Sequence, residues 1–184
     1  GTETGDIYRF SNTGDNAFAE PSVITGDGDA TRVWGGVDIT GDGLANYAVL
    51  RYYSGHEFDI GRDLFQLEVY GADTIPIFTH EFTDPRTDGT GLTAGPIGVD
   101  GTNALILAIP PRLYVVGRPT DGTDGLIWYS ECDIPSQLLV SNLDGTEGHE
   151  LLYGGVDSLI VVRRRSAGGG PAAPTGVTAS VYDS

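Results

Sequence analysis

The sequence predicts an all-β protein made of about three repeats, each of four antiparallel strands. Short apolar runs are separated by Gly, Asp, Asn, Thr and Pro, and helical periodicity is nearly absent. Similar strands begin at Leu67, Leu113 and Leu159, with two successive intervals of 46 residues (113 − 67 and 159 − 113). A period in the forties is typical of one blade of a β-propeller, so we expect β-propeller-like blades of four antiparallel strands.

The first expected strands, near 7–10 and 17–20, belong to an incomplete blade. The strand at Ile7 lies 60 residues before the one at Leu67 (67 − 7), and an insertion at 54–63 explains why this interval is longer than the others. Each later repeat has an apolar strand that follows an Asp-Gly or Asn-Gly loop. The remaining strands are expected at 47–53, 65–70, 104–109, 113–116, 125–129, 137–140 and 159–162.

Blades at 33–82, 96–130 and 136–163 are too few to close a ring, which takes four to eight blades. The last of these blades shows only three strands in the sequence. An open array of sheets exposes strand edges, which pair readily with other chains. We therefore expect either an incomplete piece of a longer propeller or copies that complete one another by exchanging strands, as a ring or a filament.

A change in composition near the C-terminus sets the domain boundaries. Residues 1–165 hold the repeats, and residues 166–174 are a Gly/Pro/Ala-rich linker. Residues 175–184 are long enough for one strand only. Such a strand, over 177–182, suits donation to another copy.

The charge of the chain narrows the classes of partner. There are 10 Lys and Arg residues against 26 Asp and Glu residues, which gives a net charge of −16. This excess opposes binding to nucleic acid or to anionic membranes, and no apolar run is long enough to span a bilayer. Acidic excess fits cation binding and also the solubility of a secreted protein. Because the sequence lacks Met even at position 1, we expect a processed chain or a fragment, located outside the cell or on its surface.

The residues from 38 to 46 form the clearest candidate site. Side-chain oxygens stand at the first, third, fifth and ninth positions of this loop, and the backbone carbonyl of the seventh can join them. Ca²⁺ prefers six to eight hard oxygen ligands, and glycines at positions 41 and 43 allow the backbone to curl around an ion. The predicted Ca²⁺ ligands are Asp38, Thr40, Asp42, Leu44 and Asn46. A solvated Asp-Gly turn is the alternative interpretation.

A second, weaker Ca²⁺ site is expected in the last repeat at the same spacing. Its ligands would be Asn142, Asp144, Thr146, Gly148 and Glu150, with Thr146 in place of the acidic residue at the fifth position. The middle repeat, at 98–103, is shorter and poor in carboxylates, so we expect it to keep the turn without the ion. A further Gly-Asp run at 24–29 is interpreted as a turn.

These loops carry a family resemblance. Asp-x-Thr-Gly-Asp-Gly-x-x-Asn before an apolar strand resembles the FG-GAP repeats of integrin-alpha-type propellers and bacterial surface proteins, over about residues 7–165. The resemblance implies a loop that joins the first two strands of a blade and binds calcium. Thr40 and Asn46 depart from the family pattern. Separately, residues 171–180 resemble the opening of a fibronectin type III domain.

We therefore expect an extracellular, calcium-stabilised structural or adhesive repeat protein that forms homo-oligomers or adjoins further domains of a longer chain. No catalytic motif appears, so we do not expect an enzyme. The alternative is a carbohydrate-binding propeller or part of a polysaccharide lyase. An acidic cluster, Glu57, Asp59 and Asp63, would serve a hydrolase. Aromatic residues that would stack on a glycan are Trp34, Tyr52, Tyr53, Phe58 and Trp128.

Overall fold

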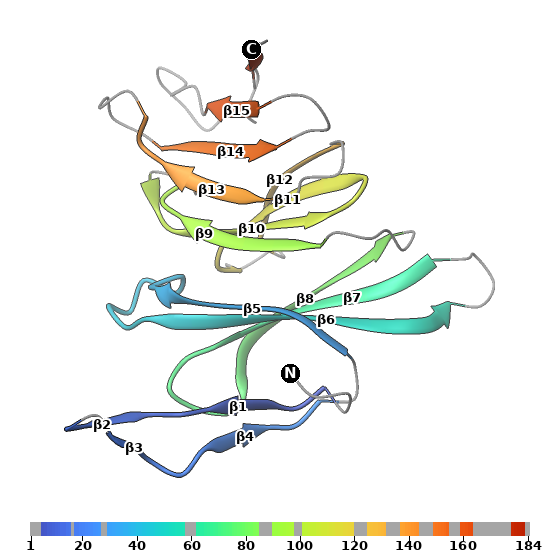
Figure 1. Ribbon diagram of the computed structural model, residues 1–184. Coiled ribbons are helices and arrows are strands. Elements are labelled where there is room, and N and C mark those ends of the chain that lie inside the picture. Colours follow the sequence, from blue (N-terminus) through green and yellow to red (C-terminus); the bar gives the residue numbers. More distant parts are fainter. Residues whose placement is uncertain are drawn as a thin grey trace. The chain divides into compact units, whose positions relative to one another are not determined.

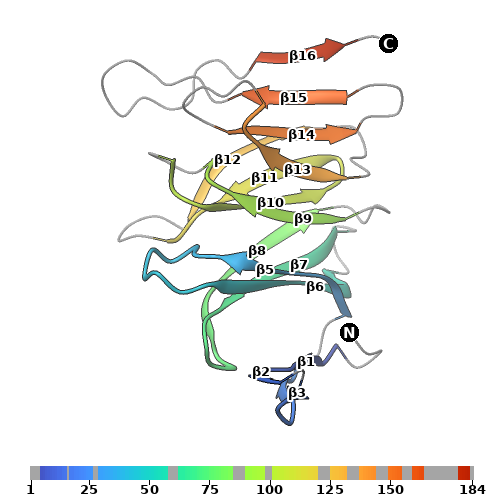
Figure 2. The same cartoon turned by 60° about the vertical axis from the view of Figure 1, so that its left-hand side comes forward.

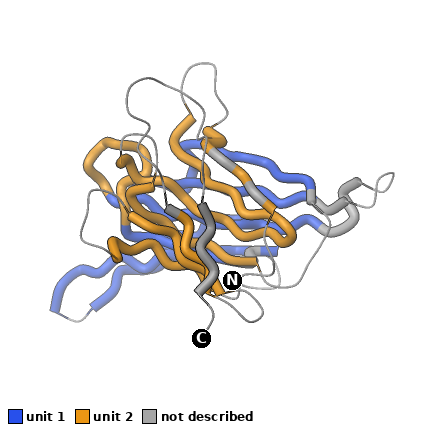
Figure 3. Tube along the Cα trace, turned by 90° about the horizontal axis from the view of Figure 1, so that it is seen from above, with its two compact units in different colours: residues 1–36, 45–85 blue, residues 37–44, 86–184 orange. Residues whose placement is uncertain are grey.

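The computed structural model describes residues 5–15, 17–26, 29–57, 62–84, 90–97, 101–119, 125–131, 137–143, 149–154, 159–163 and 178–182. The chain divides into two compact units, coloured in Figure 3. Unit 1 consists of Gly1–Gly36 and Ala45–Pro85, and unit 2 consists of Val37–Leu44 and Arg86–Ser184. Every regular element of the described residues is a β-strand, which confirms the all-β class.

Twelve of the strands form three four-stranded antiparallel sheets in which neighbours in the sequence are neighbours in the sheet (Figure 1). The repeated four-stranded unit is therefore confirmed, while its closure into a propeller remains a prediction. The sheet of unit 1 contains β5 (Asp29–Val37), β6 (Asn46–Glu57), β7 (Arg62–Tyr70) and β8 (Pro76–Asp84). The first sheet of unit 2 contains β9 (Gly91–Gly95), β10 (Ala104–Ile109), β11 (Arg112–Val116) and β12 (Leu126–Glu131). The second contains β13 (Leu138–Ser141), β14 (Glu150–Gly154), β15 (Leu159–Arg163) and β16 (Thr178–Tyr182).

The three leucines that recur at intervals of 46 residues all lie on the third strand of their sheets. Leu67 lies on β7, Leu113 on β11 and Leu159 on β15. Their partners on the second strands are Leu50, Ala108 and Gly154. These pairings set equivalent positions in the three sheets, because opposed residues of an antiparallel pair occupy the same face.

The C-terminal strand completes the last sheet within its own chain. β16 pairs with β15 from Leu159↔Tyr182 to Arg163↔Thr178, and Figure 2 shows it beside that strand. The expectation that the last repeat has only three strands is therefore wrong, because its fourth strand comes after the Gly/Pro/Ala-rich segment. That segment, at 166–174, lies outside the described residues.

Two short ribbons form the N-terminal part of unit 1. β1 (Ile7–Arg9) pairs with β4 (Ser22–Ile24), and β2 (Asn12–Gly14) pairs with β3 (Ala17–Phe18). Ile7 and Ile24 are opposed across the β1–β4 ribbon and pack with Val49 and Tyr70 of the sheet. The expected pair of leftover strands is therefore present, and one face of the ribbon is apolar and buried.

A buried ion pair also joins this N-terminal part to the sheet. The Arg51 side chain is fully buried, and its Nε donates to Glu68 Oε2 at 2.7 Å, while its Nη1 donates to the Gly5 carbonyl. The Tyr70 hydroxyl donates to the same Glu68 oxygen at 2.6 Å. Burial, and then the bond to Glu68, raise the pKa of Tyr70. The guanidinium therefore has its counter-ion within the protein, as a buried charge requires.

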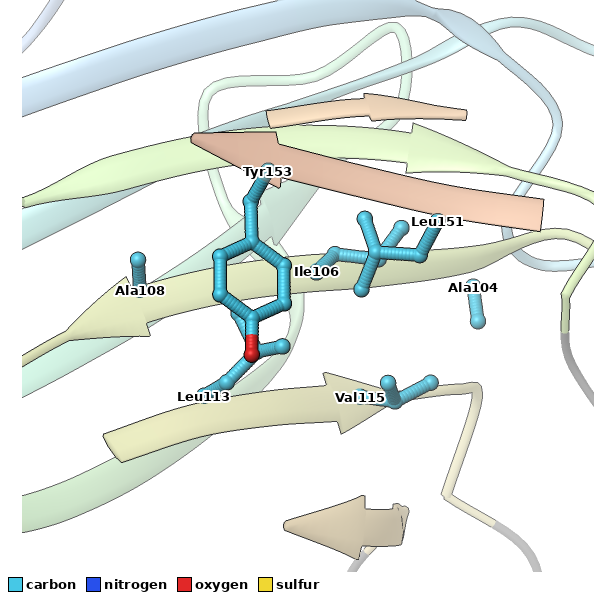
Figure 4. Close-up of a cluster of buried hydrophobic side chains, with 7 residues drawn as sticks. All are labelled: Ala104, Ile106, Ala108, Leu113, Val115, Leu151 and Tyr153. Atoms are coloured by element: carbon cyan, nitrogen blue, oxygen red, sulfur yellow. The ribbon is translucent and has the colours of Figure 1, made fainter. Parts of the chain in front are cut away.

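The core of unit 2 lies between its two sheets. Side chains of β10 and β11 pack against Leu151 and Tyr153 of β14, which point toward Ile106 and Leu113 in Figure 4. Glycines on β9 allow β13 to approach closely, since a Cβ on Gly95 would lie 2.5 Å from Val140 Cγ1. Small residues on one sheet thus accommodate branched residues on the other.

The close approach of Gly95 to Val140 predicts that one added methyl group lowers stability strongly. Gly95→Ala should lower the free energy of unfolding by roughly 1–3 kcal/mol, because valine has a stiff side chain and cannot move aside. Gly91→Ala is the matched control, since the closest atom to its Cβ would be the flexible end of Leu138, Cδ1, at 3.1 Å, and Ala108 Cβ would lie at an ordinary contact distance of 3.5 Å. Urea unfolding measures both, and a loss for Gly91→Ala at least as large as for Gly95→Ala would contradict the packing.

The ion pair predicts a second effect on stability. Glu68→Gln should lower the free energy of unfolding by roughly 3 kcal/mol, because it leaves the Arg51 charge buried without a counter-ion. Glu81→Gln on β8, at an exposed position, is the control. The double variant Arg51→Met/Glu68→Leu should recover most of the loss. Equal effects of Glu68→Gln and Glu81→Gln in denaturant unfolding would count against the pair.

Candidate metal site

The predicted calcium loop connects β5 to β6, the first two strands of their sheet. The loop at 142–149 likewise connects β13 to β14, and the segment 96–103 connects β9 to β10. Each of the three loops thus joins the first and second strands of a four-stranded sheet. This position is the one that the family resemblance implies.

The Asp38 carboxylate closes the loop on itself. Its Oδ1 accepts the backbone N–H of Gly41 at 2.6 Å and of Asp42 at 3.3 Å, and its Oδ2 accepts the N–H of Gly43 at 2.7 Å. The Thr40 hydroxyl donates to Oδ1 at 3.4 Å. Amides of three successive residues therefore converge on one carboxylate, as in the turns that Asp favours.

Left-handed glycines make this convergence possible. Gly41 has φ 76° and Gly43 has φ 83°, which L side chains rarely adopt. The same feature occurs in the middle repeat, where Gly101 has φ 74°. Asn46 and Ala104 occupy equivalent positions at the start of the second strands of their sheets. Gly43 and Gly101 each lie three residues before these positions, so the turn is a repeated feature.

The hydrogen bonds also act on the charge of the loop. The bond from Gly43, followed by those from Gly41 and Asp42, lowers the pKa of Asp38 below its ordinary value of 3.8, against an opposing effect of desolvation. Asp38 is therefore ionised at neutral pH without help from a metal.

The other predicted ligands have different surroundings. The Asp42 Oδ1 accepts the N–H of Leu44 at 2.9 Å, and the Leu44 side chain is largely exposed. Thr40 is buried, and so is Asn46, the first residue of β6. The structure thus brings Asp38 together with Thr40, and Asp42 together with Leu44, through direct hydrogen bonds.

Two residues that the sequence analysis missed hold the backbone of the loop. Asn103 Nδ2 donates to the Asp38 carbonyl at 2.8 Å, and Arg118 Nη1 donates to the Thr40 carbonyl at 2.5 Å. Both partners belong to unit 2, as does the loop. Asn103 precedes β10 and Arg118 follows β11, at separations of 65 and 78 residues that no local pattern could connect.

The second predicted site is described only in part. Glu150 begins β14 and is buried, and its Oε2 accepts the N–H of Leu143 at 2.9 Å. Glu150 lies four residues before Gly154, the partner of Leu159, just as Asn46 lies four residues before Leu50, the partner of Leu67, so the two residues occupy equivalent positions. Asn142 is exposed. Asp144, Thr146 and Gly148 lie outside the described residues.

The structure gives little support to the other candidate sites suggested by the sequence. The expectation that the middle loop is shorter than the other two is wrong. When the second strands are aligned by their pairing, the middle loop occupies 96–104, which is nine positions like the other two. In the 24–29 run, a Cβ on Gly26 would collide with the Arg51 guanidinium, which gives that glycine a packing role. Tyr52 is buried and cannot stack on a glycan. Phe58 and Asp59 lie outside the described residues.

Among the residues that the structure describes, no three His, Cys, Asp or Glu side chains gather closely enough to hold a metal ion. The Asp38 loop would depend for most of its ligands on hydroxyl, amide and carbonyl oxygens. No helix within the described ranges is long and apolar enough to cross a membrane. Comparison with protein-family models, curated proteins and solved structures found no match to this chain.

The donor set of the Asp38 loop fits a Ca²⁺ ion in chemistry. Its candidate ligands are all oxygens, and two of them are carboxylates. Asp38 already accepts four hydrogen bonds, about as many as a carboxylate has lone-pair positions, so an ion would have to replace some of these bonds. Arg118 opposes an ion, because it places a positive charge on the same loop. Because the oxygen donors favour Ca²⁺ and the charge of Arg118 opposes it, we expect only modest affinity for Ca²⁺.

The lowered pKa of Asp38 predicts a pH effect that needs no metal. A depressed folded-state pKa contributes stability above the unfolded value of about 3.8, and this contribution is lost as the pH falls through the lower folded value. In chelator, wild type should therefore have a higher Tm than Asp38→Asn at neutral pH, and the difference should shrink below pH 3.8. A difference that stays constant to pH 2 in thermal scans would contradict the assignment.

Proposed function

We propose that this chain is an extracellular, calcium-stabilised structural or adhesive repeat protein. The supporting observation is the closed loop at 38–44, which connects two strands. Left-handed glycines let backbone N–H groups of this loop donate to the Asp38 carboxylate, and the loop also carries the hard oxygen donors of Thr40 and Asp42. A loop already closed without the ion binds it with little additional ordering, which favours binding.

In this proposal the ion has a structural role. Asp38, Thr40, Asp42, the Leu44 carbonyl and Asn46 would hold Ca²⁺ and link the end of β5 to the start of β6. An ion that binds the folded loop and not the unfolded chain stabilises the folded state by mass action. The Asn142–Glu150 loop would be a weaker second site, because Thr146 stands in place of the acidic residue at the fifth position.

Calcium should therefore raise the Tm of the wild type, and Asp42→Ala should remove most of the rise, leaving the smaller contribution of the second site. At a Ca²⁺ concentration 100 times the dissociation constant, the gain in free energy of unfolding is about 2.7 kcal/mol per site. Asp42 is the residue of choice, because its side chain makes one local hydrogen bond whereas Asp38 holds the whole loop. Differential scanning calorimetry in Ca²⁺, in Mg²⁺ at equal ionic strength and in chelator measures the effect.

Asp73→Ala, at an exposed position in the turn between β7 and β8, is the matched control and should retain the full response to Ca²⁺. An equal loss of Tm for Asp42→Ala in chelator and in Ca²⁺ would reject the site. An equal gain from Mg²⁺ would reject calcium as the specific ion, because Mg²⁺ demands a stricter octahedral geometry.

A further inference from the structure

The β1–β4 ribbon of unit 1 corresponds to the third and fourth strands of a complete sheet. Ile7 on β1 takes the place of the repeated leucines of the third strands, and β4 pairs antiparallel with β1 as each fourth strand pairs with its third. A short connection then leads to the first strand of the next sheet. Six residues separate β8 from β9 (91 − 84 − 1) and β12 from β13 (138 − 131 − 1), and four separate β4 from β5 (29 − 24 − 1).

The ribbon also packs as the second half of a sheet does. In unit 2, side chains of β11 lie in one apolar cluster with Leu151 and Tyr153 of β14, the second strand of the following sheet. In unit 1, Ile7 of β1 lies in one cluster with Tyr47 and Val49 of β6, which is again the second strand of the following sheet. Both pairs stand one and three residues after the first residue of their strand, so the two contacts are equivalent.

No described strand occupies the places of the first and second strands beside the ribbon. β1 pairs with β4 alone, whereas β7, β11 and β15 each pair on both sides, and the pairs β5–β6, β9–β10 and β13–β14 already belong to their own sheets. The shortest of these pairs, with its loop, spans 17 residues (138–154), and the longest stretch outside the described residues, 164–177, has 14. The free edge of β1 therefore needs a strand pair from elsewhere.

An uncovered apolar position marks where the missing first strand would lie. A Cβ on Gly35 of β5 would lie 3.3 Å from Tyr47 Cβ, so both residues share the face on which the ribbon packs. Val33, two residues before Gly35, is on the same face and is 53% exposed. In unit 2 the corresponding face of β13 is half-buried at Leu138 and Val140, against glycines of β9. The face that the ribbon covers over β6 is thus open over β5.

We propose that the free edge of β1 binds a strand pair from a second polypeptide with the same type of repeat, and that this pair completes the sheet. The inner strand would run antiparallel to β1, so that main-chain hydrogen bonds provide affinity and alternate side chains provide specificity. It would be apolar on the side toward β6, as Ala104, Ile106 and Ala108 are on the packed side of β10. The outer strand would cover Val33. The inference goes beyond the calcium site and does not depend on it.

The β9–β10 pair of this chain is the probe that tests the edge. Residues 90–109, fused to a soluble carrier protein, should bind the full chain roughly tenfold more tightly than residues 112–131 on the same carrier, because several matched cross-strand pairs form with β1. Residues 112–131 are the matched control: they form β11–β12, an apolar pair of the same length that corresponds to the half already present. Fluorescence anisotropy in chelator measures both, which separates the result from calcium binding.

A cross-link verifies the register of the bound probe. Tyr8 takes the position of Tyr114, whose partner on β10 is Leu107. In a Cys132→Ser background, a short bismaleimide should join Tyr8→Cys to a probe that carries Leu107→Cys. It should react far less with a probe that carries Ile106→Cys, which lies on the opposite face. Tyr8 is 48% exposed, so the fold should tolerate the change.

A chimera fills the edge within one chain. Residues 90–109 placed directly before Thr4 reproduce the two-residue connection between β10 and β11 (112 − 109 − 1), so the chimera should have a higher Tm than the wild type and should no longer bind the probe. Circular dichroism melting verifies that each variant is folded, and Phe10→Cys with Leu105→Cys replaces the first thiol pair if Tyr8→Cys is not. Equal binding of the two carrier fusions, equal cross-linking of the two thiols, or full binding of the probe by the chimera would overturn the proposal.

Discussion

Every residue of β10 has a buried side chain, so both faces of this strand require a neighbouring layer. On one face of β10, packing against the β13–β16 sheet within unit 2 meets this requirement. The approach of two sheets in unit 2 is close because glycines on β9 lie against Leu138 and Val140 of β13. The strands of the last sheet are also apolar on both faces; on the outer face Leu139 and Leu159 are exposed, whereas Val161 is buried.

Two acidic side chains of this protein satisfy backbone groups at strand connections. The Asp38 carboxylate collects the amides of its own loop, and Glu150 accepts an amide of the equivalent loop in the last repeat. Arg51 is charged and buried in the interior, and Glu68 balances it. Acidic residues thus have a structural use even without a metal, because they satisfy backbone groups that the turns leave unpaired. An ion would add to loops that the protein has already formed.

Local patterns in the sequence predicted most of the fold. Short apolar runs located the strands, and the recurrence at Leu67, Leu113 and Leu159 identified the third strand of each sheet. Glycines in the Asp38 loop predicted the turn correctly, because positive φ values are a local property. A strand over 177–182 was expected, but not as the fourth strand of the last sheet, since its pairing with β15 depends on return of the chain across a long connection. Asn103 and Arg118 were missed for the same reason: their hydrogen bonds to the loop join residues far apart in the sequence.

The central claim is that sheet packing and the hydrogen bonds from backbone amides to the Asp38 carboxylate form the loop. A bound ion would only stabilise it further. Hydrogen exchange at the Gly41 and Gly43 amides in chelator tests this claim most directly, since both donate to Asp38. The account predicts slowed exchange of both amides without Ca²⁺, and loss of that protection in Asp38→Ala. Exchange at the rate of an unprotected chain in chelator, with protection only after Ca²⁺ is added, would contradict it.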